Sequence, residues 1–90
     1  MSTILLVDDD YQLRQSFARI LAEEGHTVLT AATGETGIDT IKEQNPDLVI
    51  LDVCLPGING LEAFRAIRNI EHKVPVIMMT AFGTTETAIQ

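Results

Sequence analysis

The feature that most constrains the fold is a set of four short strand-like segments, three of which are apolar runs, along a chain of 90 residues. They lie at residues 3–7, 26–31, 48–51 and 74–80. Short continuous apolar runs of this kind are typical of strands that are buried on both faces of a sheet, as in parallel sheets. The sequence therefore predicts four strands.

Segments with helical spacing separate these runs. A first helix is indicated by apolar residues three and four positions apart, with Arg14 and Arg19 on its polar face and Gly25 as its C-terminal cap. Its apolar residues are Leu13, Phe17, Ile20 and Leu21. Strands that alternate with helices predict an α/β fold, in which right-handed crossovers join a parallel sheet with helices on both faces.

Two further helices and the beginning of another follow. A second helix is expected from about Gly34 to Gln44, because Pro46 prevents it from continuing. A third follows Asn59, which can serve as its N-cap. Residues 84–86, with a hydroxyl and a carboxylate, predict the first turn of a fourth helix.

Composition excludes several classes of function. The net charge of -7 would repel phosphate backbones and anionic lipids, so we expect these residues to contact neither DNA nor a membrane. Cys54 is the only cysteine and cannot form an internal disulfide, and no basic segment precedes the first apolar run. No apolar run approaches the roughly 18 residues that a membrane helix needs. The sequence predicts a cytoplasmic protein.

Polar side chains follow three of the predicted strands. Asp8 and Asp9 follow the first, Asp52 the third and Thr80 the fourth. The carboxyl ends of parallel strands meet at one edge of a sheet, where three acids would repel one another unless a cation neutralised them. Oxygen ligands of this kind suit Mg²⁺. Alternatively, Asp8, Asp9 and Asp10 only cap the first helix, and for Asp10 we prefer that interpretation.

Asp52 is the candidate nucleophile. A carboxylate can attack phosphorus to form an acyl phosphate, although a single Asp at a strand end is more often a cap or turn residue. A Thr at a strand end is likewise an ordinary strand residue when taken alone. Only the combination of Asp52 with its acidic neighbours and Thr80 favours phosphoryl chemistry.

Three groups of residues accompany the acidic positions, in a fixed order. They are Leu6-Val7-Asp8-Asp9, then Leu51-Asp52 with Leu55-Pro56 and Asn59-Gly60, then Met79-Thr80-Ala81. With these groups, residues 4–90 resemble the receiver domains of bacterial two-component response regulators. The resemblance implies a flavodoxin-like, doubly wound parallel sheet and a switch that depends on phosphorylation.

The resemblance also implies roles for single residues. Asp52 would accept a phosphoryl group from a sensor histidine kinase, and the hydroxyl of Thr80 would then turn toward it. Asp9, Asp52 and the backbone carbonyl of Cys54 would bind Mg²⁺, and Asp8 would act through a metal-bound water. We expect the Cys54 side chain itself to be buried, as most free cysteines are.

Residues 80–83, Thr-Ala-Phe-Gly, resemble receivers attached to enhancer-binding transcription activators that work with the alternative sigma factor. DNA would then be bound only by an output domain outside these residues. Receivers also have a fifth strand, which ends in a lysine, and a fifth helix. We therefore expect residues 1–90 to form an incomplete receiver domain of four strands, three helices and the start of a fourth, with an open strand edge that favours self-association.

Other functions remain open at this stage. The chain could be an interaction module that has lost its switch. It could be a phosphatase with an aspartyl nucleophile, but such enzymes usually place a second Asp where Cys54 stands. A nucleotide or flavin binder on the same sheet would need glycines or hydroxyls after the first strand, where this chain has acids. We expect a signalling domain and not an enzyme.

Overall fold

The computed structural model describes residues 2–55, 57–70 and 73–79. Its four strands form one parallel sheet in the order β2-β1-β3-β4. The strands are β1 (Thr3–Val7), β2 (Thr27–Ala31), β3 (Leu48–Asp52) and β4 (Val76–Met79). All four predicted strands are confirmed. Thr80 and the predicted fourth helix lie outside the described residues.

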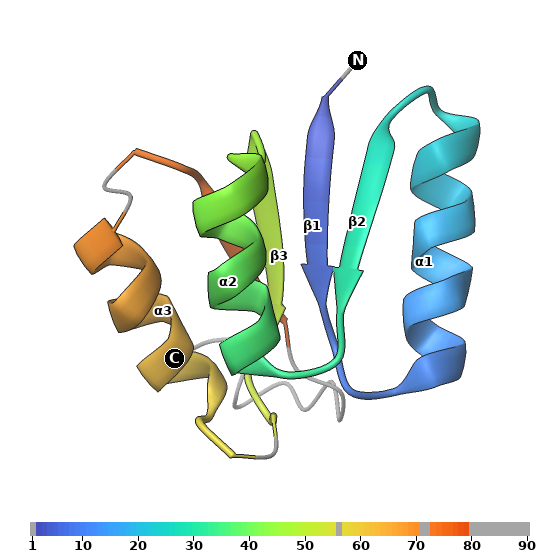
Figure 1. Cartoon of the computed structure of the whole chain (residues 1–90). Helices are drawn as coiled ribbons and strands as arrows, with labels where there is room; N and C mark the ends of the chain where they lie inside the picture. The colour runs from blue at the N-terminus through green and yellow to red at the C-terminus, as the bar shows by residue number, and fades with distance from the viewer. Residues whose placement is uncertain (1, 56, 71–72, 80–90) are drawn as a thin grey trace.

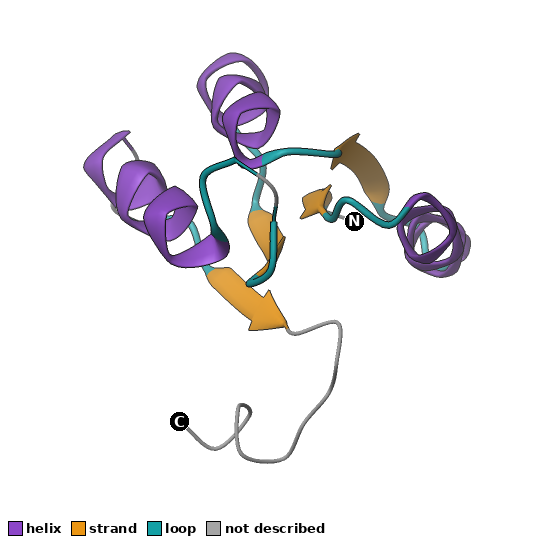
Figure 2. Ribbon diagram, turned by 90° about the horizontal axis from the view of Figure 1, so that it is seen from below, coloured by secondary structure: helices purple, strands orange, loops and turns teal. Residues whose placement is uncertain are grey.

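Three helices cover the sheet on its two faces, as Figures 1 and 2 show. They are α1 (Tyr11–Glu23), α2 (Gly34–Gln44) and α3 (Gly60–Ile70). α1 lies on one face, whereas α2 and α3 lie side by side on the other. This arrangement confirms the α/β, flavodoxin-like doubly wound fold.

Local sequence determines where two of the helices begin. Asp10 is the N-cap of α1, because its side chain accepts a hydrogen bond of 3.1 Å from the Leu13 N–H. At α3, Asn59 Oδ1 accepts from the Glu62 N–H at 2.9 Å, and the Glu62 carboxylate accepts from the Asn59 N–H at 3.1 Å. This reciprocal pair is a capping box. Both predicted caps are confirmed.

Gly25 ends α1 as predicted. Its φ of 95° lies in the left-handed region, which favours glycine. The Gly25 N–H donates to the Ala22 carbonyl at 3.0 Å, and the His26 N–H donates to the Leu21 carbonyl at 3.2 Å. These two bonds form a Schellman motif, which turns the chain into β2.

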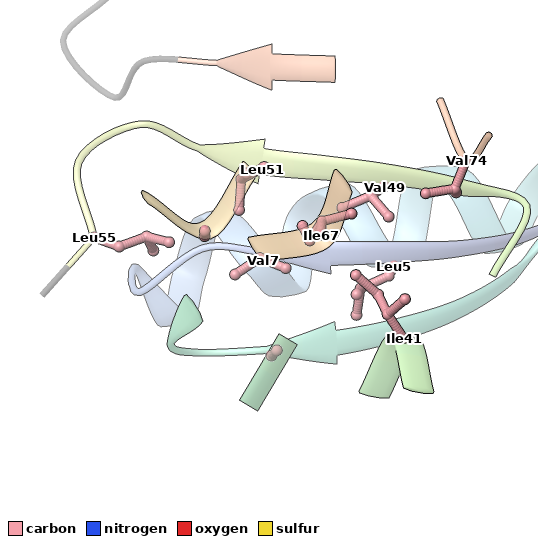
Figure 3. Packing of buried hydrophobic residues seen from close by; sticks show 10 residues of the cluster. Leu5, Val7, Ile41, Val49, Leu51, Leu55, Ile67 and Val74 are labelled. Carbon is pink, nitrogen blue, oxygen red and sulfur yellow. The ribbon is translucent and has the colours of Figure 1, made fainter. Parts of the chain in front are cut away.

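The main core lies between the sheet and the pair α2 and α3 (Figure 3). Its buried side chains come from β1, β3 and both helices, and include Leu5, Val7, Ile41, Val49, Leu51 and Ile67. Ile4 and Leu6 alternate with Leu5 and Val7 and are also buried, on the face where α1 lies. The central strand β1 is thus buried on both faces, as its apolar run predicts.

The predicted apolar face of α1 is only partly buried. Phe17 is 37% exposed, Ile20 is 55% exposed, and no residue of α1 is buried. The physical reason is that α1 contacts mainly β2, on a face where no second helix lies among the described residues. Part of its apolar stripe therefore faces solvent. None of the described helices is long and apolar enough to span a membrane.

Candidate functional site

Three carboxylates gather at the carboxyl edge of the sheet, which is the lower edge in Figure 1. Asp8 and Asp9 directly follow β1, and Asp52 is the last residue of β3. One oxygen atom from each of the three lies within 4.8 Å of the others. Asp8 and Asp52 are each 1% exposed, whereas Asp9 is exposed. The predicted clustering of these three residues is confirmed.

The Asp8 carboxylate is held by its own loop. The Asp8 N–H donates to the Ala31 carbonyl at 3.0 Å, and Asp8 Oδ1 accepts from the Asp10 N–H at 2.8 Å. The second oxygen, Oδ2, is buried, and no donor of the described residues reaches it. A buried carboxylate oxygen without a donor is costly. It therefore marks a place where a positive group would stabilise the site.

The Asp52 carboxylate is placed in a similar way. Asp52 Oδ1 accepts from the Cys54 N–H at 3.1 Å, and the buried Oδ2 meets no donor of the described residues. The first residue of α3, Gly60, packs against the backbone just beyond β3, and its N–H donates to the Val53 carbonyl at 2.9 Å. The strand end that carries Asp52 is thus fixed by the start of α3.

The electrostatics of the site oppose ionisation. Burial raises the pKa of Asp8, and the charges of Asp9 and Asp10 raise it further, against the lowering effects of the Asp10 N–H and Arg14. Burial also raises the pKa of Asp52, with added repulsion from Asp8 and Asp9, although the Cys54 N–H lowers it. Two orphaned oxygens in an all-oxygen donor set fit Mg²⁺, which binds carboxylates and neutralises them.

The raised pKa values predict how stability depends on pH. In the unfolded chain Asp8 and Asp52 have the ordinary Asp pKa of about 3.8, and burial in the folded protein raises both values, so the folded protein binds their protons more tightly. Without metal, the free energy of unfolding should therefore rise as the pH is lowered from 7 toward this value. Denaturant titrations in EDTA at a series of pH values measure this change. A steady loss of stability over the same range would contradict the prediction, and saturating Mg²⁺ should remove the gain.

Cys54 differs from its prediction in one respect. Its thiol is exposed, not buried, because the chain leaves the sheet at Asp52 and Cys54 lies in the loop beyond it. Its backbone N–H faces the Asp52 carboxylate. The role predicted for its backbone carbonyl as a metal ligand stays a prediction.

Sequence analysis missed one residue at the site. Arg14, which was assigned to the polar face of the first helix, turns its side chain back to the loop, where Nη1 donates to the Asp8 carbonyl at 2.6 Å. Its position in the second turn of a helix that starts beside the acids was the available signal. The pattern of apolar residues alone gives no such information.

The fold and the acidic edge define a receiver-like α/β domain, and comparison with known proteins agrees. Residues 4–90 match the family model described as response regulator receiver domain. The chain is 46% identical over 81 residues to the transcriptional regulatory protein AfsQ1 of Streptomyces coelicolor, with 90% of this chain and 36% of AfsQ1 covered. It is 38% identical over 80 residues to the sporulation initiation phosphotransferase F of Bacillus subtilis, with 89% and 64% covered.

A solved structure is also similar. The response regulator TrrA of Thermotoga maritima, in complex with Mg(2+)-BeF, superposes with a TM-score of 0.87 and 40% identity, and the match covers 92% of this chain and 72% of TrrA. The chain thus spans less than two thirds of each of the two curated relatives. It belongs to the response regulator receiver domain family, whose members signal by phosphorylation in two-component systems.

Proposed function

We propose that this chain is a phosphoryl-accepting signalling domain and that Asp52 is the acceptor of a phosphoryl group from a sensor histidine kinase. One observation carries the proposal. Asp52 Oδ2 is buried at the end of β3 without a donor among the described residues, in a group of three carboxylates within 4.8 Å. The unpaired oxygen can act as a nucleophile, and the neighbouring carboxylates can hold the cation that the reaction needs.

The chemistry follows from the contacts of Asp52. Oδ1 is oriented by the Cys54 N–H, which leaves Oδ2 to form the new bond to phosphorus. The bond between phosphorus and the donor nitrogen breaks, and its electron pair stays on the imidazole of the kinase. The product on this chain is an acyl phosphate. Transfer of this kind depends on positioning and on stabilisation of charge.

Mg²⁺ would be held by the side chains of Asp9 and Asp52 and by the backbone carbonyl of Cys54, with Asp8 acting through a metal-bound water, and it would neutralise the phosphoryl oxygens. The three clustered carboxylates support this assignment. The TrrA structure in complex with Mg(2+)-BeF supports it as well. Thr80, which lies outside the described residues, is proposed to donate its hydroxyl to the phosphoryl group.

The proposed output is control of transcription through an attached or partner domain, in which DNA is bound outside this chain. The similarity to a transcriptional regulatory protein supports this output. The net charge of -7 disfavours DNA binding by this chain, so we propose that the phosphoryl group is accepted here and DNA is bound by another domain.

Acetyl phosphate provides the test. With Mg²⁺ present, the protein should gain one phosphoryl group that hydroxylamine removes, because hydroxylamine cleaves acyl phosphates, and EDTA should prevent the gain. Intact-mass spectrometry measures the incorporation. A protein that gains nothing at any donor concentration would be an interaction module without a switch. Repeated release of phosphate from a phosphate monoester such as p-nitrophenyl phosphate would instead indicate a phosphatase.

A further inference from the structure

The side chain of Arg14 joins α1 to the loop of residues 8–10, which connects β1 to α1 and contains Asp8 and Asp9. Besides the bond from Nη1 to the Asp8 carbonyl, its guanidinium carbon lies 5.6 Å from the centroid of the Tyr11 ring, within the range of a cation–π contact. Its backbone N–H donates to the Asp10 carbonyl at 2.9 Å. One residue thus contacts the loop through its main chain, its charged group and an aromatic neighbour.

These contacts complete the set that orients Asp8. The Asp8 N–H is bound by Ala31, Oδ1 by the Asp10 N–H, and the carbonyl by Arg14. With three polar groups of one residue engaged, the Asp8 carboxylate is held in the group that it forms with Asp9 and Asp52, and its Oδ2 stays without a donor among the described residues. The Arg14 bond is the one member of this set that comes from a side chain outside the loop.

We propose that Arg14 is a positioning residue, which fixes the loop that carries Asp8 and Asp9 so that their carboxylates face the metal and the phosphoryl group. The inference rests on the proposed function, because it assigns Arg14 a part in the same Mg²⁺ site. Arg14 acts through the Asp8 carbonyl and contacts neither the metal nor the phosphoryl group.

The charge of Arg14 makes the proposal sharply testable. A positive group beside a cation site repels the cation, so loss of the charge alone would tighten Mg²⁺ binding. Loss of positioning has the opposite effect, because the carboxylates no longer converge. Outer partners that orient metal ligands are typically worth about 10-fold or more in metal affinity. The direction of the change therefore separates the two effects.

The test is a Mg²⁺ titration of the wild type and of Arg14→Met, in which binding is measured by calorimetry. Tyrosine fluorescence provides a second measurement, and it reports on Tyr11 alone because the chain has one tyrosine and no tryptophan. Arg14→Met keeps the length of the side chain and removes its donors, and it should bind Mg²⁺ about 10-fold more weakly. Arg19→Met removes the same charge from an exposed position of the same helix and is the matched control. The Mg²⁺ affinity of Arg19→Met should stay within about two-fold of the wild type, a much smaller change than the one expected for Arg14→Met.

Unchanged or tighter binding by Arg14→Met would overturn the proposal. Arg14→Lys keeps a donor and the charge, so its affinity should fall between those of the wild type and Arg14→Met. If Arg14→Met does not fold, weaker binding by Arg14→Lys than by the wild type supports the proposal, and equal binding overturns it. Failure of the wild type to bind Mg²⁺ at all would contradict the proposed function, whereas wild-type binding with an indifferent Arg14 would contradict this inference alone.

Discussion

Asp52→Asn should abolish phosphoryl incorporation from acetyl phosphate, whereas Asp10→Asn should retain it. The first change replaces the proposed nucleophile with an amide, which cannot form an acyl phosphate. The second makes the same chemical change in the loop after β1, at the N-cap of α1, where Asn serves as well as Asp. Intact mass after incubation with Mg²⁺ and acetyl phosphate measures both. Incorporation by Asp52→Asn at the wild-type level would show that another residue is the acceptor.

The same variant should be more stable than the wild type when metal is absent. The Asp52 carboxylate is buried beside Asp8, its pKa is raised by burial, and its Oδ2 has no donor among the described residues. An amide removes one of the repelling charges and offers a donor near the second orphaned oxygen. We expect the free energy of unfolding in EDTA at pH 7 to rise by about 1–3 kcal/mol.

Denaturant titration with and without Mg²⁺ checks this expectation. Mg²⁺ should stabilise the wild type more than Asp52→Asn, because at a given concentration a ligand that binds the folded state more tightly stabilises it more. Asp10→Asn should show a smaller gain, since Asp10 is exposed. A metal-free Asp52→Asn that is less stable than the wild type would show that burial of this carboxylate is already compensated. Loss of phosphorylation together with a gain in stability is therefore the signature of a residue kept for function.

Much of the fold follows from local sequence. The sequence predicts all four strands, although β2 starts one residue later than expected, at Thr27, and β4 two residues later, at Val76. Pro46 and Gly25 mark helix ends, and Asp10 and Asn59 mark helix starts, because each acts within a few residues of itself. Signals of this range need no knowledge of the rest of the chain.

The meeting of the three carboxylates at the candidate site was predictable from the sequence, but the energetics of the site were not. Parallel strands bring their carboxyl ends to one edge, so the meeting of Asp8, Asp9 and Asp52 follows from topology. The burial of Asp8 and Asp52 depends instead on how the loops close over the edge. The exposure of Cys54 likewise depends on the path of the loop after β3, whereas the bond from Arg14 to the Asp8 carbonyl joins residues only six positions apart.

Residues far from the site illustrate the same limit. The spacing of Phe17 and Ile20 predicts an apolar face correctly, but it contains no information on how much surface the neighbouring elements cover. The exposed Ile77 of β4 is a similar case, at 52%. Self-association through this part of the sheet stays a prediction.

Gly60→Ala should cost about 3 kcal/mol of stability and also weaken Mg²⁺ binding. A Cβ at Gly60 would lie 2.5 Å from the Asp52 carbonyl oxygen and 2.5 Å from Val53 Cα. Both contacts are with backbone, so no side chain can turn away to relieve them. Either α3 or the end of β3 must shift, and the shift moves the strand end that carries the Asp52 carboxylate.

Gly25→Ala is the matched control for this effect. A Cβ there meets nothing within 4 Å, but the φ of 95° strains any residue with a side chain, so the change should cost about 1–2 kcal/mol. Gly25 lies after the C-terminus of α1, at the opposite end of that helix from Asp8 and Asp9, so Mg²⁺ affinity should not change. Thermal unfolding measures the stability of both variants, and Mg²⁺ titration measures their metal affinity. If Gly60→Ala loses stability but binds Mg²⁺ like the wild type, the contact between α3 and β3 supports the fold without setting the position of Asp52.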